Sequence, residues 1–132
     1  MYLLDTNIII YILKGNEMVK KNLLKHYHDS MSISVVTLME LYYGAYKSQK
    51  WESNLAKIKS IENSIEVLSL GKESVEIFGI QKAKLEKLGT PLDDFDLIQA
   101  ACAMTHNLTL VTNNTKHFER IEGLKLANWA NE

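Results

Sequence analysis

The chain has 132 residues, and its 15 basic and 16 acidic side chains leave a formal net charge of −1. This length suffices for one domain with a hydrophobic core of its own, so we expect a single domain over residues 1–132. The near-zero charge excludes proteins that bind nucleic acid through overall positive charge, and any recognition of phosphate groups must then be local.

The only cysteine, Cys102, excludes an internal disulfide and a zinc site made of several thiolates. The longest uninterrupted apolar run, from Ile8 to Leu13, is too short to cross a membrane. This run also lacks the preceding basic segment and the cleavage site of a signal peptide. We therefore expect a cytoplasmic protein with no membrane segment.

In the first half of the chain, an apolar run at residues 2–4 predicts a buried strand, and residues 8–13 predict the helix after it. Apolar residues spaced by four between positions 19 and 27 predict an amphipathic helix. Residues 31–36 alternate and are rich in β-branched side chains, which predicts a second strand. A helix over residues 37–46 follows it.

The second half continues this alternation. The apolar spacing predicts, in order, a helix near residues 55–61, a strand at 65–70, a helix over 75–88, a strand at 108–112 and a short strand at 124–126. Residues 93–106 are apolar on almost every side, which predicts a buried helix. Strands separated by helices indicate an α/β fold with a parallel sheet, in which functional groups collect beyond the carboxyl ends of the strands.

Three acidic residues occupy such positions. Asp5 follows the first strand, Glu40 lies in the helix after the second strand, and Asp96 opens the buried helix. Each has a purely structural alternative. Asp5 can cap the helix after it, and Glu40 can form a capping box with Thr37. Asp96 and its neighbour Asp93 can stabilise a helix N-terminus.

Several carboxylates that converge on one sheet edge repel one another unless a divalent cation neutralises them. A set of carboxylates without cysteine favours hard cations such as Mg²⁺ or Mn²⁺, which activate water for attack on a phosphodiester. Thr112, Asn113 and Asn114 follow a predicted strand and offer further oxygen ligands, although Asn-Asn is also ordinary turn chemistry. We therefore predict a metal-dependent hydrolase.

The same segments resemble a known family. Leu-Leu-Asp5-Thr-Asn, the stretch from Ser-Val-Val-Thr to Glu40, and Pro-Leu-Asp-Asp-Phe-Asp96 are similar to the three acidic motifs of PIN-domain toxins of the VapC type. The segment that begins Val-Thr112-Asn-Asn is similar to the C-terminal signature of these toxins. The resemblance covers essentially the whole chain.

This resemblance implies a PIN-like α/β/α sandwich with a central parallel sheet of about four to five strands. It also implies a Mg²⁺- or Mn²⁺-dependent endoribonuclease that is the toxin of a type II toxin–antitoxin pair. A cognate antitoxin would block its acidic site. The protein would form a homodimer or a heteromer with the antitoxin.

Carried over by position, Asp5, Glu40 and Asp96 match the catalytic, metal-binding acids of the family, with Glu40 in contact directly or through water. Asn114 stands where relatives often have a fourth acid, which disfavours tight binding of a second metal. The expected supporting residues are Thr6, Thr112, Asn113, Asn114 and Asp93. The candidates for contacts with RNA phosphates are Lys14, Lys47, Lys116 and Arg120.

Other functions remain open from the sequence. A PIN nuclease with no antitoxin and a catalytically silent binding module both fit the motifs. A phosphohydrolase with Asp5 as its nucleophile fits less well, because the second Asp such enzymes use is replaced by Asn7.

Aromatic residues gather near the middle of the chain, where they can stack on single-stranded RNA or pack against a partner. These are Tyr42, Tyr43, Tyr46 and Trp51.

Overall fold

The computed structural model describes residues 1–131 and is built around a parallel sheet. Its strands, within this range, are β1 (Tyr2–Leu4), β2 (Met31–Ser34), β3 (Glu66–Leu68), β4 (Thr109–Val111) and β5 (Leu126–Ala127). They lie in the order β3-β2-β1-β4-β5, and every neighbouring pair is parallel. The carboxyl ends of all strands therefore meet at one edge, with β1 in the middle.

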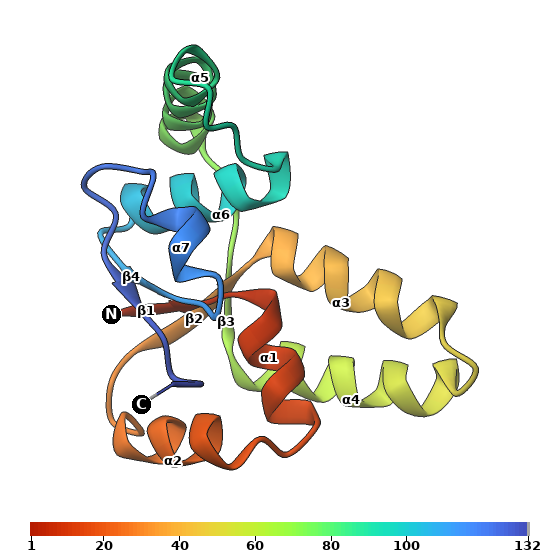
Figure 1. The fold of residues 1–132 in the computed structure, drawn as a ribbon. Coiled ribbons are helices and arrows are strands. Elements are labelled where there is room, and N and C mark those ends of the chain that lie inside the picture. Colours follow the sequence, from red (N-terminus) through yellow and green to blue (C-terminus); the bar gives the residue numbers. More distant parts are fainter. Residues whose placement is uncertain (132) are drawn as a thin grey trace.

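Helices cover both faces of this sheet (Figure 1). Leu4 of β1 faces a core formed with α1 to α4, whereas its neighbour Leu3 faces a core formed with α5 to α7. Successive residues of a strand point to opposite faces, so the apolar pair covers both layers. The helices are α1 (Thr6–Leu13), α2 (Glu17–Lys25), α3 (Val35–Lys47), α4 (Trp51–Ser64), α5 (Lys72–Lys87), α6 (Asp94–Thr105) and α7 (Thr115–Phe118).

The predicted α/β/α sandwich with a parallel sheet is confirmed. Figure 1 shows α3 and α4 side by side as a hairpin that extends away from the sheet, and α5 stacked outside α6. As predicted, α6 is buried among its neighbours, with Leu97, Ala100 and Ala103 at most 2% exposed. No helix in the described part of the chain is long and apolar enough to cross a membrane.

Two predicted boundaries near the second strand are wrong for one reason. The hydroxyl of Ser34 accepts a hydrogen bond from the backbone N–H of Thr37, so Ser34 is the N-cap of α3. The strand therefore ends at residue 34 and the helix begins at Val35, two residues earlier than predicted. Thr37 lies inside the helix, which makes a capping box between Thr37 and Glu40 wrong as well.

Other elements are also shorter or shifted, and β4 spans residues 109–111 instead of 108–112. Helix α2 ends at Lys25, and Tyr27 lies in the turn that follows it. Strand β3 spans residues 66–68 instead of 65–70. The last strand is at residues 126–127 instead of 124–126, because its register is set by pairing with residues 110–111 of β4.

Truncation of a core residue of the sheet should cost far more stability than truncation of the same residue type on the surface. Ile33 is fully buried on β2, whereas Ile80 on α5 is 54% exposed. Ile33→Ala should lower the free energy of unfolding by about 2–5 kcal/mol, and Ile80→Ala by less than about 1 kcal/mol. Urea denaturation followed by circular dichroism measures both. Equal losses would show that this face of β2 is not packed as described.

Candidate active site

Asp5 is the most enclosed acid of the site, with 4% of its surface exposed at the end of β1. One oxygen, Oδ1, accepts hydrogen bonds from the backbone N–H of Thr6 at 2.9 Å and from Gln99 Nε2 at 2.8 Å. The other, Oδ2, accepts from Thr112 Oγ1 at 2.8 Å and from Asn7 Nδ2 at 3.2 Å. A carboxylate has about four acceptor positions, so these four donors occupy all of them and fix the orientation of the Asp5 side chain.

Glu40 reaches the same place from the second turn of α3. Its Oε1 accepts a hydrogen bond of 2.6 Å from the hydroxyl of Thr6, the residue next to Asp5. The Thr6 oxygen also lies 3.2 Å from the hydroxyl oxygen of Thr37. Burial raises the pKa of Glu40, and the negative charges of Asp5 and Asp93 raise it further, while the Thr6 hydrogen bond acts in the opposite direction.

Asp96, in the first turn of α6, is half-buried, and it accepts no hydrogen bond from any residue in the range 1–131. Burial, followed by the charges of Asp5 and Asp93, raises the pKa of Asp96 from its ordinary 3.8 to about 6. His117 lowers this pKa and Glu40 raises it, so both side chains lie within electrostatic reach of Asp96. The structure thus brings the three predicted acids to one place.

Asp93 has the capping role that was its structural alternative. It is the N-cap of α6, and its Oδ1 accepts a hydrogen bond of 2.8 Å from the backbone N–H of Phe95. Its neighbour Asp94 points away from the acids and pairs with Lys82 at 2.9 Å. Asp93 nevertheless contributes negative charge to the site, because it raises the pKa of both Asp96 and Glu40.

The acids fit a divalent cation. No group of three His, Cys, Asp or Glu side chains in residues 1–131 already stands in the arrangement of a metal site. However, Asp96 is half-buried without a donor, and Glu40 has one carboxylate oxygen without one. Both pKa values are raised in the direction that a nearby cation would reverse. Oxygen ligands of this kind suit hard cations.

The predicted polar residues after β4 lie beside the acids. Thr112 is fully buried and donates to Asp5, and its hydroxyl oxygen accepts from the backbone N–H of Asn114 at 3.0 Å. Asn113 is exposed, and its backbone N–H donates to Asn7 Oδ1 while its side-chain amide donates to Tyr11 Oη. These bonds hold the loop after β4 against the start of α1.

The four basic candidates lie on the surface, at different distances from the acids. Lys14 lines a pocket of about 320 Å³ that also contains Glu40. Lys47 lies over the ring of Tyr43, with Nζ 4.8 Å from the ring centre. Lys116 is exposed on α7, whereas Arg120 donates a hydrogen bond of 2.8 Å to the carbonyl oxygen of Pro91. Lys14 is thus the basic candidate that shares a surface depression with an acid.

Buried polar residues that were not predicted from the sequence lie behind the acids. Gln99 and Thr37 are at most 1% exposed, and both are hydrogen-bonded to each other and to other residues of the site. A glutamine in the middle of an otherwise apolar helix was the signal that could have found this group, since a buried amide requires partners.

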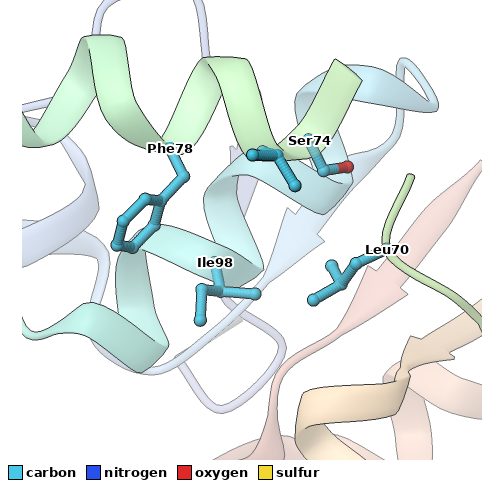
Figure 2. Close-up of a pocket in the computed structure, with 5 residues that line it drawn as sticks. Leu70, Ser74, Phe78 and Ile98 are labelled. Atoms are coloured by element: carbon cyan, nitrogen blue, oxygen red, sulfur yellow. The ribbon is translucent and has the colours of Figure 1, made fainter. Parts of the chain in front are cut away.

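An apolar pocket of about 170 Å³ lies apart from the acids, between α5 and α6. Figure 2 shows Phe78, Ile98 and Leu70 around it, with Ser74 at its margin. The Ser74 hydroxyl is 3.0 Å from that of Thr105, so it joins the two helices. With no charged side chain in its lining, this pocket has no groups for catalysis.

Three of the four aromatic residues near the middle of the chain, Tyr42, Tyr46 and Trp51, form a stack on α3 and α4. Tyr46 stacks on Tyr42 at 6.4 Å and on Trp51 at 6.0 Å between ring centres. Tyr43, Tyr46 and Trp51 are between 43% and 67% exposed. The stack therefore lies on the surface of the α3–α4 hairpin, outside the acidic site.

With this fold and acidic edge described, comparisons with known proteins identify the class. The family model for the PIN domain matches residues 2–124, so the chain belongs to the PIN-domain family. The chain is 40% identical over 129 residues to the tRNA(fMet)-specific endonuclease VapC of Shigella flexneri, covering 98% of each protein. It is 37% identical over 128 residues to ribonuclease VapC2 of Haemophilus influenzae, covering 97% of each. The resemblance to VapC-type PIN domains is confirmed.

Solved structures agree with this result. The VapBC2 structure of Rickettsia felis, bound to a DNA fragment from the promoter, matches with a TM-score of 0.90 and 36% identity, covering 97% of this chain and 98% of that one. The DNA-bound VapBC structure of Salmonella typhimurium matches with a TM-score of 0.89 and 36% identity, covering 97% of both chains.

From the raised pKa of Asp96 we predict how the free energy of unfolding of the metal-free protein depends on pH. In the folded protein Asp96 keeps its proton up to about pH 6, whereas in the unfolded chain it loses the proton near the ordinary pKa of 3.8. The proton on Asp96 therefore stabilises the fold fully below pH 3.8, and this stabilisation is lost as pH rises through about 6. Asp96→Asn should therefore stabilise the protein in EDTA at pH 7.5, and the gain should shrink at pH 5. Since solvent screens a half-buried group, the gain is on the order of 1 kcal/mol.

Thermal or urea denaturation at the two pH values measures this gain. Asp94→Asn is the matched control, because Asp94 lies on the same helical turn but is exposed and paired with Lys82. It should bring no gain at either pH. A loss of stability in Asp96→Asn at pH 7.5 would contradict the assigned effect of burial and neighbouring negative charge on Asp96.

Proposed function

We propose that this protein is a metal-dependent endoribonuclease that hydrolyses RNA phosphodiester bonds, with Asp5, Glu40 and Asp96 as its catalytic acids. The observation that carries the proposal is their convergence from β1, α3 and α6 on one sheet edge. The ribonuclease and endonuclease names of its VapC relatives support the same activity.

In this proposal Asp96 and Glu40 would hold a Mg²⁺ or Mn²⁺ ion together with Asp5, whose carboxylate is fixed in place by its four hydrogen bonds. Such an ion lowers the pKa of a bound water and stabilises the charge that develops on a phosphodiester. Thr6 orients Glu40, and Thr112 orients Asp5. Asn114 adds no negative charge to the set, which favours one tightly bound ion.

We further propose that the protein is the toxin of a toxin–antitoxin pair. The VapBC assemblies named in its structural relatives support this role. An antitoxin segment has a place to bind in the pocket of about 320 Å³, which extends from Glu40 along α1, α3 and α4 and is lined in part by Ile10 and Leu13. Occupation of this pocket would cover Glu40 and Lys14.

The remaining assignments follow from these two roles. We propose that the protein acts in the cytoplasm, because its RNA substrates and an antitoxin encoded by the same cell are both present there. We propose that residues 1–132 act as a single PIN domain and assemble as a homodimer or with the antitoxin. Phosphate groups of RNA would meet Lys14 first, because this lysine and Glu40 line the same pocket. Lys47, Lys116 and Arg120 are the other candidates for such contacts.

Cleavage of labelled RNA by the purified protein tests the activity. Initiator tRNA should be among the substrates, because the Shigella flexneri relative is named for it. With Mn²⁺ or Mg²⁺ we expect discrete cuts, which EDTA abolishes. Asp96→Asn should lower the rate by at least about 100-fold, because it removes a ligand charge without breaking a hydrogen bond. Gel analysis of end-labelled products measures the rate.

Asp94→Asn is again the control and should cut at the wild-type rate. Cleavage by Asp96→Asn at this rate would remove Asp96 from the catalytic set. A folded wild-type protein that neither binds Mn²⁺ nor cuts RNA would favour the silent binding module instead.

The toxin role is tested separately with the product of the neighbouring gene. If that gene encodes an antitoxin, its purified product should form a stable complex with this chain and suppress cleavage. Leu13→Glu should weaken this complex by at least about tenfold, because it places a charge in the apolar part of the pocket. Calorimetric titration measures the affinity. Active nuclease with no binding to any product of its operon would indicate a PIN nuclease without an antitoxin.

A further inference from the structure

Gln99 is a buried amide directly behind the acidic site. It lies on α6, one turn after Asp96, and is 1% exposed. Its neighbours Leu97, Ala100 and Ala103 are also buried but apolar. A buried amide without partners would destabilise the fold, so the hydrogen bonds that Gln99 makes decide its role.

Both hydrogens of this amide are directed toward the site. Nε2 donates to Asp5 Oδ1 at 2.8 Å and to the hydroxyl oxygen of Thr37 at 2.6 Å. On the other side, Oε1 accepts from the hydroxyl of Ser34. This orientation of the amide is required, because an ionised carboxylate has no hydrogen to give and must face the amide nitrogen.

The bond to Thr37 continues to Glu40. The hydroxyl of Thr6 donates to Glu40 at 2.6 Å and, at the longer distance of 3.2 Å, also to the hydroxyl oxygen of Thr37. The Thr37 oxygen therefore accepts from both Gln99 and Thr6. The result is a continuous hydrogen-bonded network from Gln99 through Thr37 and Thr6 to Glu40, in which the bonds influence one another.

Gln99 therefore differs from a buried polar group that only joins two helices. Ser74 and Thr105 are an example of the latter, since their hydroxyl pair connects α5 to α6 and reaches no acid. Each N–H bond of Gln99, in contrast, ends on one of the carboxylates, directly at Asp5 and through two hydroxyls at Glu40. Because Gln99 also shares α6 with Asp96, it relates the positions of all three acids.

We propose that Gln99 is a positioning residue of the acidic site, which fixes Asp5 directly and Glu40 through Thr37 and Thr6 relative to Asp96. The role in metal binding and cleavage rests on the proposed function. The role in holding the two carboxylates does not, because it is a property of the metal-free protein.

The test compares Gln99→Met, which keeps the size of the side chain but has no N–H, with Ser74→Ala as the control for loss of a hydrogen bond between α5 and α6. In the metal-free proteins at pH 7.5, the ¹³C NMR signals of the Asp5 and Glu40 carboxyl groups should move in Gln99→Met and stay in place in Ser74→Ala. The Mn²⁺ dissociation constant of Gln99→Met should rise about 10- to 100-fold. Its kcat should fall at least about tenfold, with KM for RNA within about threefold.

Thr37→Val is the second variant, and it decides the matter if Gln99→Met does not fold. It breaks the branch to Glu40 and leaves the bond to Asp5, so only the Glu40 signal should move. Unmoved carboxyl signals in folded Gln99→Met, or in Thr37→Val in its place, would overturn the inference. A wild-type protein that binds no Mn²⁺ and cuts no RNA would instead overturn the proposed function, while the NMR comparison would still decide the role of Gln99.

Discussion

A carboxylate enclosed at the end of the central strand is the constraint on which this structure depends. Asp5 is 4% exposed, and a charge at such depth is tolerated only where donors surround it. Its four donors come from the start of α1, from the end of β4 and from the middle of α6. The central place of β1 in the sheet brings these segments together. The hydrogen bonds that stabilise the Asp5 carboxylate therefore depend on the order of the strands.

The acids divide into two kinds that complement each other. The protein itself satisfies Asp5, whereas Asp96 accepts no hydrogen bond from the described residues and Glu40 accepts one. Asp5 and Asp96 lie at the starts of α1 and α6, where the positive ends of the helix dipoles offset part of their charge. Burial, followed by the remaining repulsion from Asp5 and Asp93, raises the pKa values of Asp96 and Glu40.

Local pattern explains why most of the fold could be predicted. Apolar runs at β1 and β4 and the apolar circumference of α6 are properties of adjacent residues. The acids at positions 5, 40 and 96 could be predicted for the same reason, because carboxyl ends of parallel strands share one edge. Their roles in catalysis remain predictions. The structure adds that all three lie within electrostatic reach of one another.

What could not be predicted depends on contacts between distant residues. Gln99 is 94 positions from Asp5 and 65 from Ser34, and a hydrogen bond over such a separation leaves no periodicity to detect. The register of β5 is likewise decided by β4. The hydrogen bond from Arg120 to the carbonyl oxygen of Pro91 also joins residues 29 positions apart, while the phosphate contact of Arg120 stays a prediction.

The separation of Thr112 from Asp5 also determines when the site can exist. The two residues are 107 positions apart, so a ribosome makes the acid early and its hydroxyl donor late. Because β4 must pair beside β1 before Thr112 reaches Asp5, a growing chain cannot complete the site until most of it has been translated. The hydrogen-bonded setting of Asp5 is therefore completed only after at least 107 further residues have been synthesised.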